Sequence, residues 1–130
     1  MNRGLLDTSV FIAREQARPL ATLPLEVALS VVTLGELELG VHAARDPDAR
    51  AQRADTLALA RAADPLPVSE SIMGCFALLV NDCRVAGSRP KVLDALIAAT
   101  AVDQGLAVVT QDSDFDTIAA VHPPLEVLRV

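Results

Sequence analysis

Hydrophobic positions along the chain form two kinds of pattern, short continuous runs and longer stretches with helical periodicity. The short runs are typical of strands that are buried on both faces of a sheet, and they lie at residues 4–6, 27–31, 66–68, 107–109 and 125–128. The longer stretches predict helices over about 33–44, 48–62, 70–85 and 90–104, which end near prolines or glycines. Strands that alternate with helices predict an α/β fold, with a mostly parallel sheet of about five strands covered by helices on both faces.

One aspartate interrupts an apolar helical stretch, "KVLDALIAAT" at residues 91–100. If Pro90 takes the first helical position, Asp94 lies a full turn later, too deep to cap the helix and at the limit of helpful dipole interaction. An unpaired buried carboxylate is costly unless it is neutralised, paired or bound to a metal ion. For an isolated acid, a salt bridge to Arg89, Lys91 or another basic residue would be the simpler explanation of Asp94.

Three more acids are expected at the same edge of the sheet. Asp7 directly follows the first strand and Asp112 follows the fourth, and parallel sheets bind ligands outside the carboxyl ends of their strands. Glu36 is placed in the first turn of the helix that follows the second strand. Its alternative role is a capping box with Thr33, because the two residues have the required spacing. Asp116 has a similar capping alternative through Ser113.

Packed carboxylates raise one another's pKa and destabilise the fold, unless a divalent cation keeps them ionised. Ligation by oxygen atoms alone selects hard ions, so we expect one or two Mg²⁺ or Mn²⁺ ions. His42 and His122 lack the spacing of a zinc site, and neither lies in an acidic motif. A bound metal would convert the acidic edge into a receptor for phosphate.

The charge balance bears on whether the chain can bind a nucleic acid. With 11 Lys and Arg against 17 Asp and Glu, the net charge is -6, whereas a simple electrostatic binder of nucleic acid is basic. Removing the four site acids leaves 17 − 4 = 13 acidic residues against 11 basic ones, which weakens that objection. The sequence has no Trp or Tyr and three Phe, which argues against base-stacking platforms of the OB or RRM kind. Any RNA or DNA would be held by its phosphates.

The chain of 130 residues has the length of one ordinary domain, so we expect a single domain over residues 1–130. No apolar run approaches the roughly 18 residues that a membrane span needs, and Asp7 breaks the first apolar segment. These features predict a cytoplasmic protein without a membrane contact. Cys75 and Cys83 lack CxxC spacing, so they are interpreted as buried reduced thiols rather than as a zinc site or a disulfide.

Four short motifs occur in a distinctive order and spacing across nearly the whole chain: "LLDTSVFI", "VVTLGELELG", "KVLDALIAATA" and "VVTQDSDFD". Together they resemble the PIN-domain ribonucleases and, within them, the VapC-type toxins of bacterial toxin–antitoxin pairs. The resemblance implies a three-layer α/β/α sandwich and a metal-dependent endoribonuclease. Such a toxin inhibits translation until its antitoxin neutralises it.

The resemblance also implies roles for particular residues. The acids that match the family's metal site are Asp7, Glu36, Asp94 and Asp112. Asp114 stands beside the fourth acid and could share or replace its role. The positions of small hydroxyl residues that support the site match Thr8, Ser9 and Thr110, whose alternative roles are helix capping and plain strand-end chemistry. For hydrolysis, the acids would hold the ions that activate a water for in-line attack on the phosphodiester.

Phosphate contacts are expected from basic residues near these motifs, although each could simply be a solvated surface residue. The candidates are Arg14, Arg89 and Lys91, with Arg45, Arg50 and Arg53 as a further group. The resemblance implies two protein partners: a VapB-type antitoxin whose tail occupies the acidic groove, and a second toxin chain in a homodimer. Residues 12–25 and 44–64 could present helix faces to such partners, or they could simply cover the sheet.

Three other functions remain open from the sequence. A DNA-directed nuclease would use the same metal site. A non-catalytic binding module could keep the acids for a metal that stabilises the fold. A phosphotransfer enzyme or receiver domain also gathers acids at strand ends, but Asp7 lacks the DxDxT pattern and Thr110-Gln111-Asp112 stands where a receiver would have a lysine.

Overall fold

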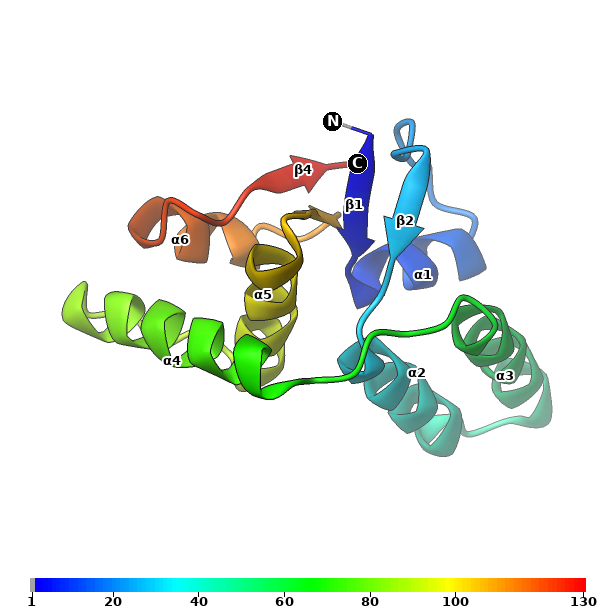
Figure 1. Cartoon of the computed structure of the whole chain (residues 1–130). Coiled ribbons are helices and arrows are strands. Elements are labelled where there is room, and N and C mark those ends of the chain that lie inside the picture. The colour runs from blue at the N-terminus through cyan, green and yellow to red at the C-terminus, as the bar shows by residue number, and fades with distance from the viewer. Residues whose placement is uncertain (1) are drawn as a thin grey trace.

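In the computed structural model, which describes residues 2–130, strands and helices alternate at both ends of the chain, and four consecutive helices lie between these parts (Figure 1). The strands are β1 (Arg3–Leu6), β2 (Glu26–Ala28), β3 (Ala107–Thr110) and β4 (Val127–Arg129). The helices are α1 (Thr8–Glu15), α2 (Val31–Ala43), α3 (Pro47–Arg61), α4 (Glu70–Val85), α5 (Val92–Gln104) and α6 (Asp114–Val121). All strand pairs are parallel, in the order β2-β1-β3-β4, as the alternation of strands and helices predicts.

Within residues 2–130 the sheet contains four strands rather than about five, because residues 66–68 do not form a strand. Only an isolated bridge between Ser30 and Leu66 forms there, in which Leu66 N–H donates to Leu29 O at 2.8 Å. Pro67 has no N–H group and cannot extend the ladder. The segment therefore serves as the connection between α3 and α4.

Helices cover both faces of the sheet, because successive side chains of its central strands point in opposite directions. Leu5 and Val108 belong to a core with residues of α4, α5 and α6, whereas Leu6 and Val109 belong to a core with residues of α1, α2 and α3. Figure 1 shows the two groups of helices on opposite sides of β1. The fold is the expected α/β/α sandwich.

The central strands approach each other closely at Gly4. A Cβ atom at this position would lie 2.4 Å from Val109 Cγ2 and 3.1 Å from Pro24 Cγ. Valine is stiff at χ1 and cannot move its methyl group freely, so this register of β1 against β3 requires glycine.

The strand order reverses at β1, which pairs with β2 on one side and with β3 on the other. Chain segments leave this point in opposite directions, and a crevice opens outside the carboxyl ends of the strands. The residues that follow β1 and β3 therefore meet at the switch point of the sheet.

Both cysteines are free thiols, and Cys83 is buried as expected, but Cys75 is half-buried. Within the part of the chain described, no helix is long and apolar enough to cross a membrane.

Candidate metal centre

An acidic cleft of about 380 Å³ lies at the carboxyl ends of β1 and β3. Its lining includes all five acids that the sequence places at the site: Asp7, Glu36, Asp94, Asp112 and Asp114. They come from the ends of two strands and from helices α2, α5 and α6. The structure thus brings together residues that are more than 100 positions apart in the sequence.

Asp7 connects β1 to α1 and is 3% exposed. As the N-cap of α1 it accepts a hydrogen bond from Ser9 N–H at 3.4 Å, and its Oδ2 also accepts one from the Thr110 hydroxyl at 2.9 Å. The alternative that Thr8 or Ser9 caps this helix is therefore wrong, because both already lie inside it. These two donors hold the buried carboxylate in one orientation.

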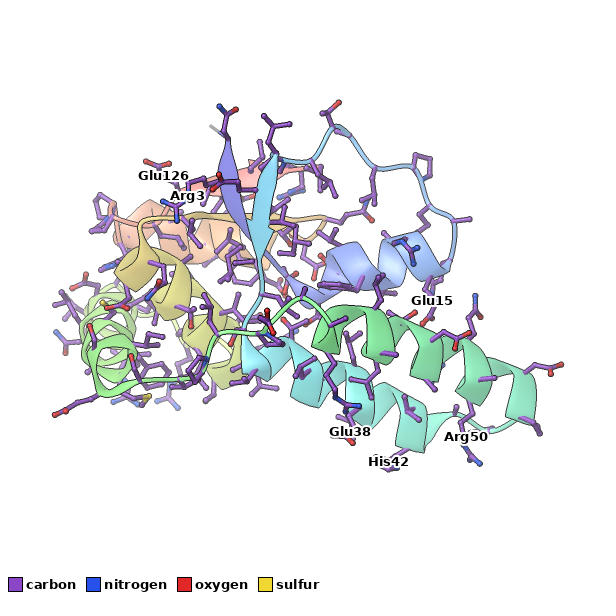
Figure 2. The ribbon with its side chains drawn as sticks, turned by 45° about the vertical axis from the view of Figure 1, so that its right-hand side comes forward. Arg3, Glu15, Glu38, His42, Arg50 and Glu126 are labelled. Atoms are coloured by element: carbon purple, nitrogen blue, oxygen red, sulfur yellow. The ribbon has the colours of Figure 1, made fainter. Side chains whose placement is uncertain are left out.

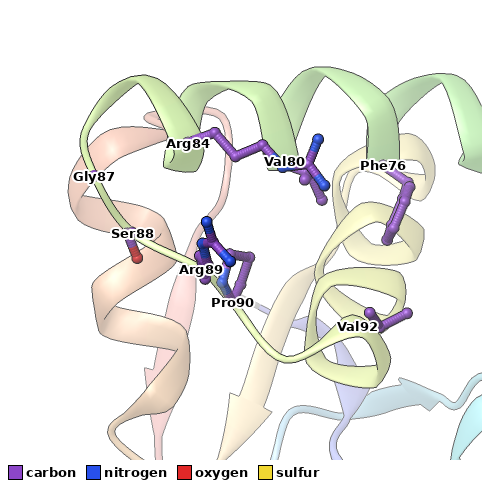
Figure 3. Close-up of a pocket in the computed structure, with 8 residues that line it drawn as sticks. All are labelled: Phe76, Val80, Arg84, Gly87, Ser88, Arg89, Pro90 and Val92. Atoms are coloured by element: carbon purple, nitrogen blue, oxygen red, sulfur yellow. The ribbon is translucent and has the colours of Figure 1, made fainter.

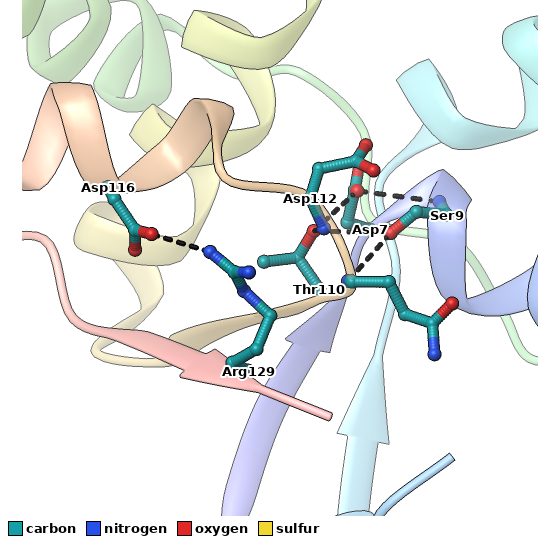
Figure 4. A network of polar contacts seen from close by, with 7 residues as sticks. Asp7, Ser9, Thr110, Asp112, Asp116 and Arg129 are labelled. Carbon is teal, nitrogen blue, oxygen red and sulfur yellow. Dashed lines mark hydrogen bonds and ion pairs between the residues drawn. The ribbon is translucent and has the colours of Figure 1, made fainter. Parts of the chain in front are cut away.

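A network of hydroxyl groups joins the ends of β1 and β3 (Figure 4). Ser9 Oγ lies 3.1 Å from Thr110 Oγ1 and accepts from Gln111 N–H at 3.0 Å. Thr110 Oγ1 also accepts from Asp112 N–H at 2.9 Å. The network fixes the turn that carries Asp112 next to Asp7, so Thr110 does more than end a strand.

Glu36 does not form the capping box considered from the sequence. Helix α2 begins at Val31, and its N-cap is Ser30, whose side chain accepts from Val32 N–H at 3.0 Å. Glu36 therefore lies in the second turn, where helix N–H groups are already bonded within the helix. Its Oε1 instead accepts a hydrogen bond from the Thr8 hydroxyl at 2.7 Å. Thr33, the expected partner, is buried and lies 3.2 Å from that hydroxyl.

Asp94 lies closer to its helix start than the sequence suggested. Helix α5 begins at Val92 rather than at Pro90, so Asp94 is in the first turn and within reach of the helix dipole. The expected alternative, a salt bridge to Arg89 or Lys91, does not form: across residues 2–130, Asp94 has no ion pair. Lys91 instead contacts Asp114, with 3.5 Å between Nζ and Oδ2.

The carboxylates of the cleft disfavour one another's ionised forms. Burial is the largest cause that raises the pKa of Asp94, to about 6, and the negative charges of Asp7, Asp114 and Glu36 add to it. Burial and neighbouring acids also raise the pKa values of Glu36 and Asp112, whereas the Thr8 hydrogen bond lowers that of Glu36. A positive charge in the cleft would relieve this repulsion.

The donor set fits a hard divalent cation, because it consists of carboxylate oxygens supported by hydroxyl groups. Within residues 2–130, no three His, Cys, Asp or Glu side chains are gathered closely enough to hold an ion as they stand. Asp7 is held by Ser9 and Thr110 and Glu36 by Thr8, whereas Asp112 is exposed. Ligation would therefore need small side-chain movements toward a common centre.

Two basic side chains line the acidic cleft, Lys91 and Arg18. Lys91 is one of the predicted phosphate contacts, but Arg18 is not, and its charge lowers the pKa of Asp112. Arg14 lines a separate hollow beside α3, and Arg89 lines hollows next to the cleft. The cleft thus combines five acids with two flanking cations.

The other predicted basic group lies on α3 and the loop before it, away from the cleft lining. Arg50 donates to Ala44 O at 3.0 Å and Arg53 to Gly40 O at 2.7 Å, contacts that hold α3 against the end of α2. Arg45 is exposed. None of the three is a lining residue of the described cleft.

Neither histidine lines the cleft. His42 is exposed near the end of α2, and Figure 2 shows it with Glu38 on the outer surface of that helix. His122 is buried, and its Nδ1 lies 2.7 Å from Asp82 Oδ2 in a contact between α4 and the end of α6. Asp116 pairs with Arg129 at 2.5 Å rather than with the cleft (Figure 4). Histidine acid–base chemistry is therefore not built into this site.

Comparisons with known proteins agree with this geometry. The family model described as "PIN domain" matches residues 4–121. Ribonuclease VapC8 of Mycobacterium tuberculosis is 63% identical over 100 residues, which cover 75% of this chain and 89% of that protein. Ribonuclease VapC4 of the same species is 44% identical over 132 residues, covering 100% and 98%. The crystal structure of VapBC-5 from Mycobacterium tuberculosis, from a family of toxin–antitoxin systems, matches with a TM-score of 0.89 at 40% identity and covers all of both chains.

Proposed function

The chain belongs to the PIN-domain family, and from this premise we propose that it is an endoribonuclease of the VapC type, the toxin of a toxin–antitoxin pair. The convergence of five carboxylates at the switch point of the sheet carries the proposal, because such an arrangement would attract a cation and, through it, a phosphodiester. Relatives named as ribonucleases, at up to 63% identity, support RNA as the substrate rather than DNA.

The cofactor in this proposal is Mg²⁺ or Mn²⁺, as one or two ions. Asp7, Glu36, Asp94 and Asp112 would hold it, and Asp114 would contribute less directly because Lys91 already engages its carboxylate. When bound, a divalent cation supplies an activated water and stabilises the charge that develops on the phosphate oxygens.

The chain's own side chains prepare the site for that chemistry. Thr110 and Ser9 hold Asp7, and Thr8 holds Glu36, so two ligand groups are oriented before any ion or substrate arrives. Lys91 and Arg18 bring positive charge to the rim of the cleft, where they would attract the phosphate groups on either side of the cleaved bond.

The partners in this proposal are a VapB-type antitoxin and a second copy of the chain. The structure of VapBC-5, which matches the whole chain, is described as a member of the VapBC family of toxin–antitoxin systems. A basic antitoxin side chain in the acidic cleft would satisfy the same carboxylates as the cation. Residues 12–25, which lead from α1 to β2, and residues 44–64, which include α3, offer the surfaces for such contacts.

The test is metal-dependent cleavage of RNA by the purified chain, freed of any antitoxin. Total cellular RNA is incubated with the protein in Mg²⁺, in Mn²⁺ and in EDTA, and Asp94→Asn is compared with Glu38→Gln. Both variants neutralise one acid, but Glu38 points to solvent from the outer surface of α2 (Figure 2). The proposal expects discrete cleavage that needs metal, disappears in Asp94→Asn and persists in Glu38→Gln.

Other results would contradict it. Cleavage of RNA by a folded Asp94→Asn variant at the wild-type rate would remove Asp94 from the site. Metal-dependent cleavage of DNA but not RNA would change the substrate class. A protein that binds metal yet cuts neither nucleic acid would be a binding module.

A further inference from the structure

A second hollow, of about 730 Å³, lies between helix α4 and the loop of residues 86–91 that leads into α5 (Figure 3). The polar side chains that line it are Arg84, Ser88 and Arg89, and the described lining contains no Asp or Glu. The chain as a whole carries a net charge of -6. This hollow is therefore a cationic site in an acidic protein.

The loop that carries Arg89 is held in a defined shape. Helix α4 ends in a Schellman turn, in which Ser88 N–H donates to Cys83 O at 2.8 Å and Gly87 N–H donates to Arg84 O at 3.0 Å. Gly87 has a φ of +78°, a left-handed conformation that side chains disfavour. Pro90 stiffens the chain further. The hollow is thus built by the backbone rather than by a flexible loop.

Two guanidinium groups face this space without an acidic partner. Figure 3 shows Arg84 running along α4 toward Val80 and Arg89 extending from the loop toward the same space. Neither arginine forms an ion pair anywhere in residues 2–130. Two neighbouring cations repel each other, and a phosphate ligand would relieve that repulsion while accepting paired hydrogen bonds from each planar fork.

The hollow also offers an aromatic surface. Of the three aromatic side chains in the sequence, Phe11 and Phe115 are buried, whereas Phe76 is half-buried and lines the hollow (Figure 3). A partly exposed ring beside two arginines suits a nucleotide, because the ring can stack with a base while the arginines hold the backbone. An acidic peptide would use the arginines but not the ring.

The hollow and the acidic cleft each share lining residues with a third, smaller hollow. This smaller hollow, of about 160 Å³, shares Ser88, Arg89 and Pro90 with the larger one. The smaller hollow also shares Lys91, Asp94 and Asp114 with the cleft. Lys91 lines the cleft, Arg89 lines both hollows and Arg84 lines the larger one, so a strand that leaves the cleft would meet these cations in that order.

We propose that the hollow of Arg84, Arg89 and Phe76 binds single-stranded RNA next to the segment that is cut, holding its phosphates with the arginines and one base on the phenylalanine. The inference rests on the proposed function, since it gives that nuclease a subsite outside its metal centre. The subsite supplies affinity and leaves the chemical step to the cleft.

The first experiment measures the binding of a fluorescent single-stranded RNA in EDTA, where no cleavage occurs, at increasing KCl. The double variant Arg84→Ala/Arg89→Ala is compared with Arg3→Ala/Arg61→Ala, which loses the same charge from exposed positions that line neither the cleft nor the two hollows. We expect the first variant to bind about tenfold more weakly and to reduce the salt slope by about 1.4, from roughly 0.7 per lost phosphate contact on single-stranded nucleic acid. The second variant should bind like the wild type.

A separate readout uses Phe76→Leu, which keeps an apolar side chain against the core but removes the ring. Loss of stacking should weaken binding by roughly fivefold or more, with an unchanged salt slope. If both arginine pairs weaken RNA binding equally, binding depends on the overall charge of the protein and not on this hollow, and the proposal is overturned. Wild-type RNA binding by Arg84→Ala/Arg89→Ala, combined with loss of binding to the antitoxin, would also overturn it and would assign the hollow to a protein partner.

Cleavage kinetics separate this inference from the proposed function. In Mg²⁺, Arg84→Ala/Arg89→Ala should raise KM for a long RNA about tenfold with kcat within about twofold, because neither arginine touches the reacting phosphate. A dinucleotide too short to reach the hollow should be cut equally by variant and wild type. If the wild type cuts RNA and the variant has the same KM, the assignment of the subsite is wrong, but the proposed nuclease function is retained. If the wild type cuts no RNA, the proposed function itself is wrong, and the subsite that rests on it is wrong as well.

Discussion

The Thr8 hydroxyl donates a hydrogen bond to Glu36 Oε1 at 2.7 Å and so connects the first turn of α1 to the second turn of α2. Glu36 is half-buried beside other acids, and this bond is the main local interaction that lowers its pKa. A threonine next to one acidic residue therefore positions another that lies 28 residues away and favours its ionised form.

Removing that hydroxyl should weaken cation binding. In Thr8→Val the side chain keeps its shape, but Glu36 loses its donor and becomes harder to ionise. We expect about tenfold weaker Mn²⁺ binding by calorimetry, which is the effect of losing roughly 1.4 kcal/mol of a charge-assisted hydrogen bond. Thr8→Ser keeps the hydroxyl and should bind like the wild type, so equal loss in both variants would show that the methyl group matters instead.

The metal-free protein should become more stable on mild acidification. The pKa of Asp94 is raised to about 6 in the folded protein, above its ordinary value of 3.8, so the folded state holds the proton more tightly than the unfolded state. The stabilisation that comes from protonated Asp94 is complete below about pH 4 and is lost as the pH rises through 6. Urea unfolding in EDTA between pH 4.5 and 7 measures this dependence.

Asp94→Asn should remove that part of the pH dependence, because asparagine stays neutral. We expect its free energy of unfolding near pH 7 to rise by about 1 to 2 kcal/mol, less than the full shift would give, since solvent screens part of the repulsion. The same variant should lose RNA cleavage. A variant less stable than the wild type in EDTA would show that Asp94 has a stabilising partner in the folded protein.

Cation binding should stabilise the fold. An ion that relieves repulsion among the cleft carboxylates binds the folded state, so at about 100 times its Kd it should add about 2.7 kcal/mol to the free energy of unfolding. Thermal unfolding at increasing Mn²⁺ should show a rising Tm in the wild type and a much smaller rise in Glu36→Gln. Glu38→Gln is the control, and an equal loss of response in both variants would exclude a local site.

Gly4 should tolerate no side chain. Gly4→Ala places a methyl group against the stiff Val109 and should destabilise the fold by about 1 to 3 kcal/mol. Gly74 provides the opposite case, since it lies inside α4 with no atom within 4 Å of an added Cβ, and Gly74→Ala should stabilise by about 0.5 to 1 kcal/mol. Urea midpoints of both variants test whether the difference comes from space rather than from helix or strand propensity.

The parallel sheet and the meeting of the acids follow from sequence because they depend on order along the chain. Asp7 and Asp112 each follow a buried apolar strand, and parallel topology brings such positions to one edge. Segment 66–68 was predicted wrongly as a strand, since an apolar run of three residues says little about pairing and Pro67 limits it to one bridge.

Helix starts were harder to predict. Thr33 and Glu36 have capping-box spacing, but Ser30 caps α2 instead, and Pro90 precedes α5 rather than opening it. Several residues in a row can begin a helix, and the surrounding packing selects one of them.

No pattern in the sequence indicated that Arg18 lines the cleft. This residue follows α1 in a Schellman turn, where Arg18 N–H donates to Ala13 O at 2.8 Å, and this turn aims its chain segment back toward the site. The left-handed position is Ala17, with a φ of 53°, so the glycine that usually marks such a turn is missing. The sequence therefore favoured Arg14, which the helix directs to another surface.

The acidic cleft draws its side chains from nearly the whole length of the chain, from Asp7 to Asp114. A nascent chain on the ribosome carries Asp7 and Glu36 long before Asp94 and Asp112 are made, and a truncated product never gains the last two. On the proposed function, neither can assemble a cutting centre. The chain would therefore become an active nuclease only after its synthesis is complete. The antitoxin is then needed from the moment the chain is released, and not before.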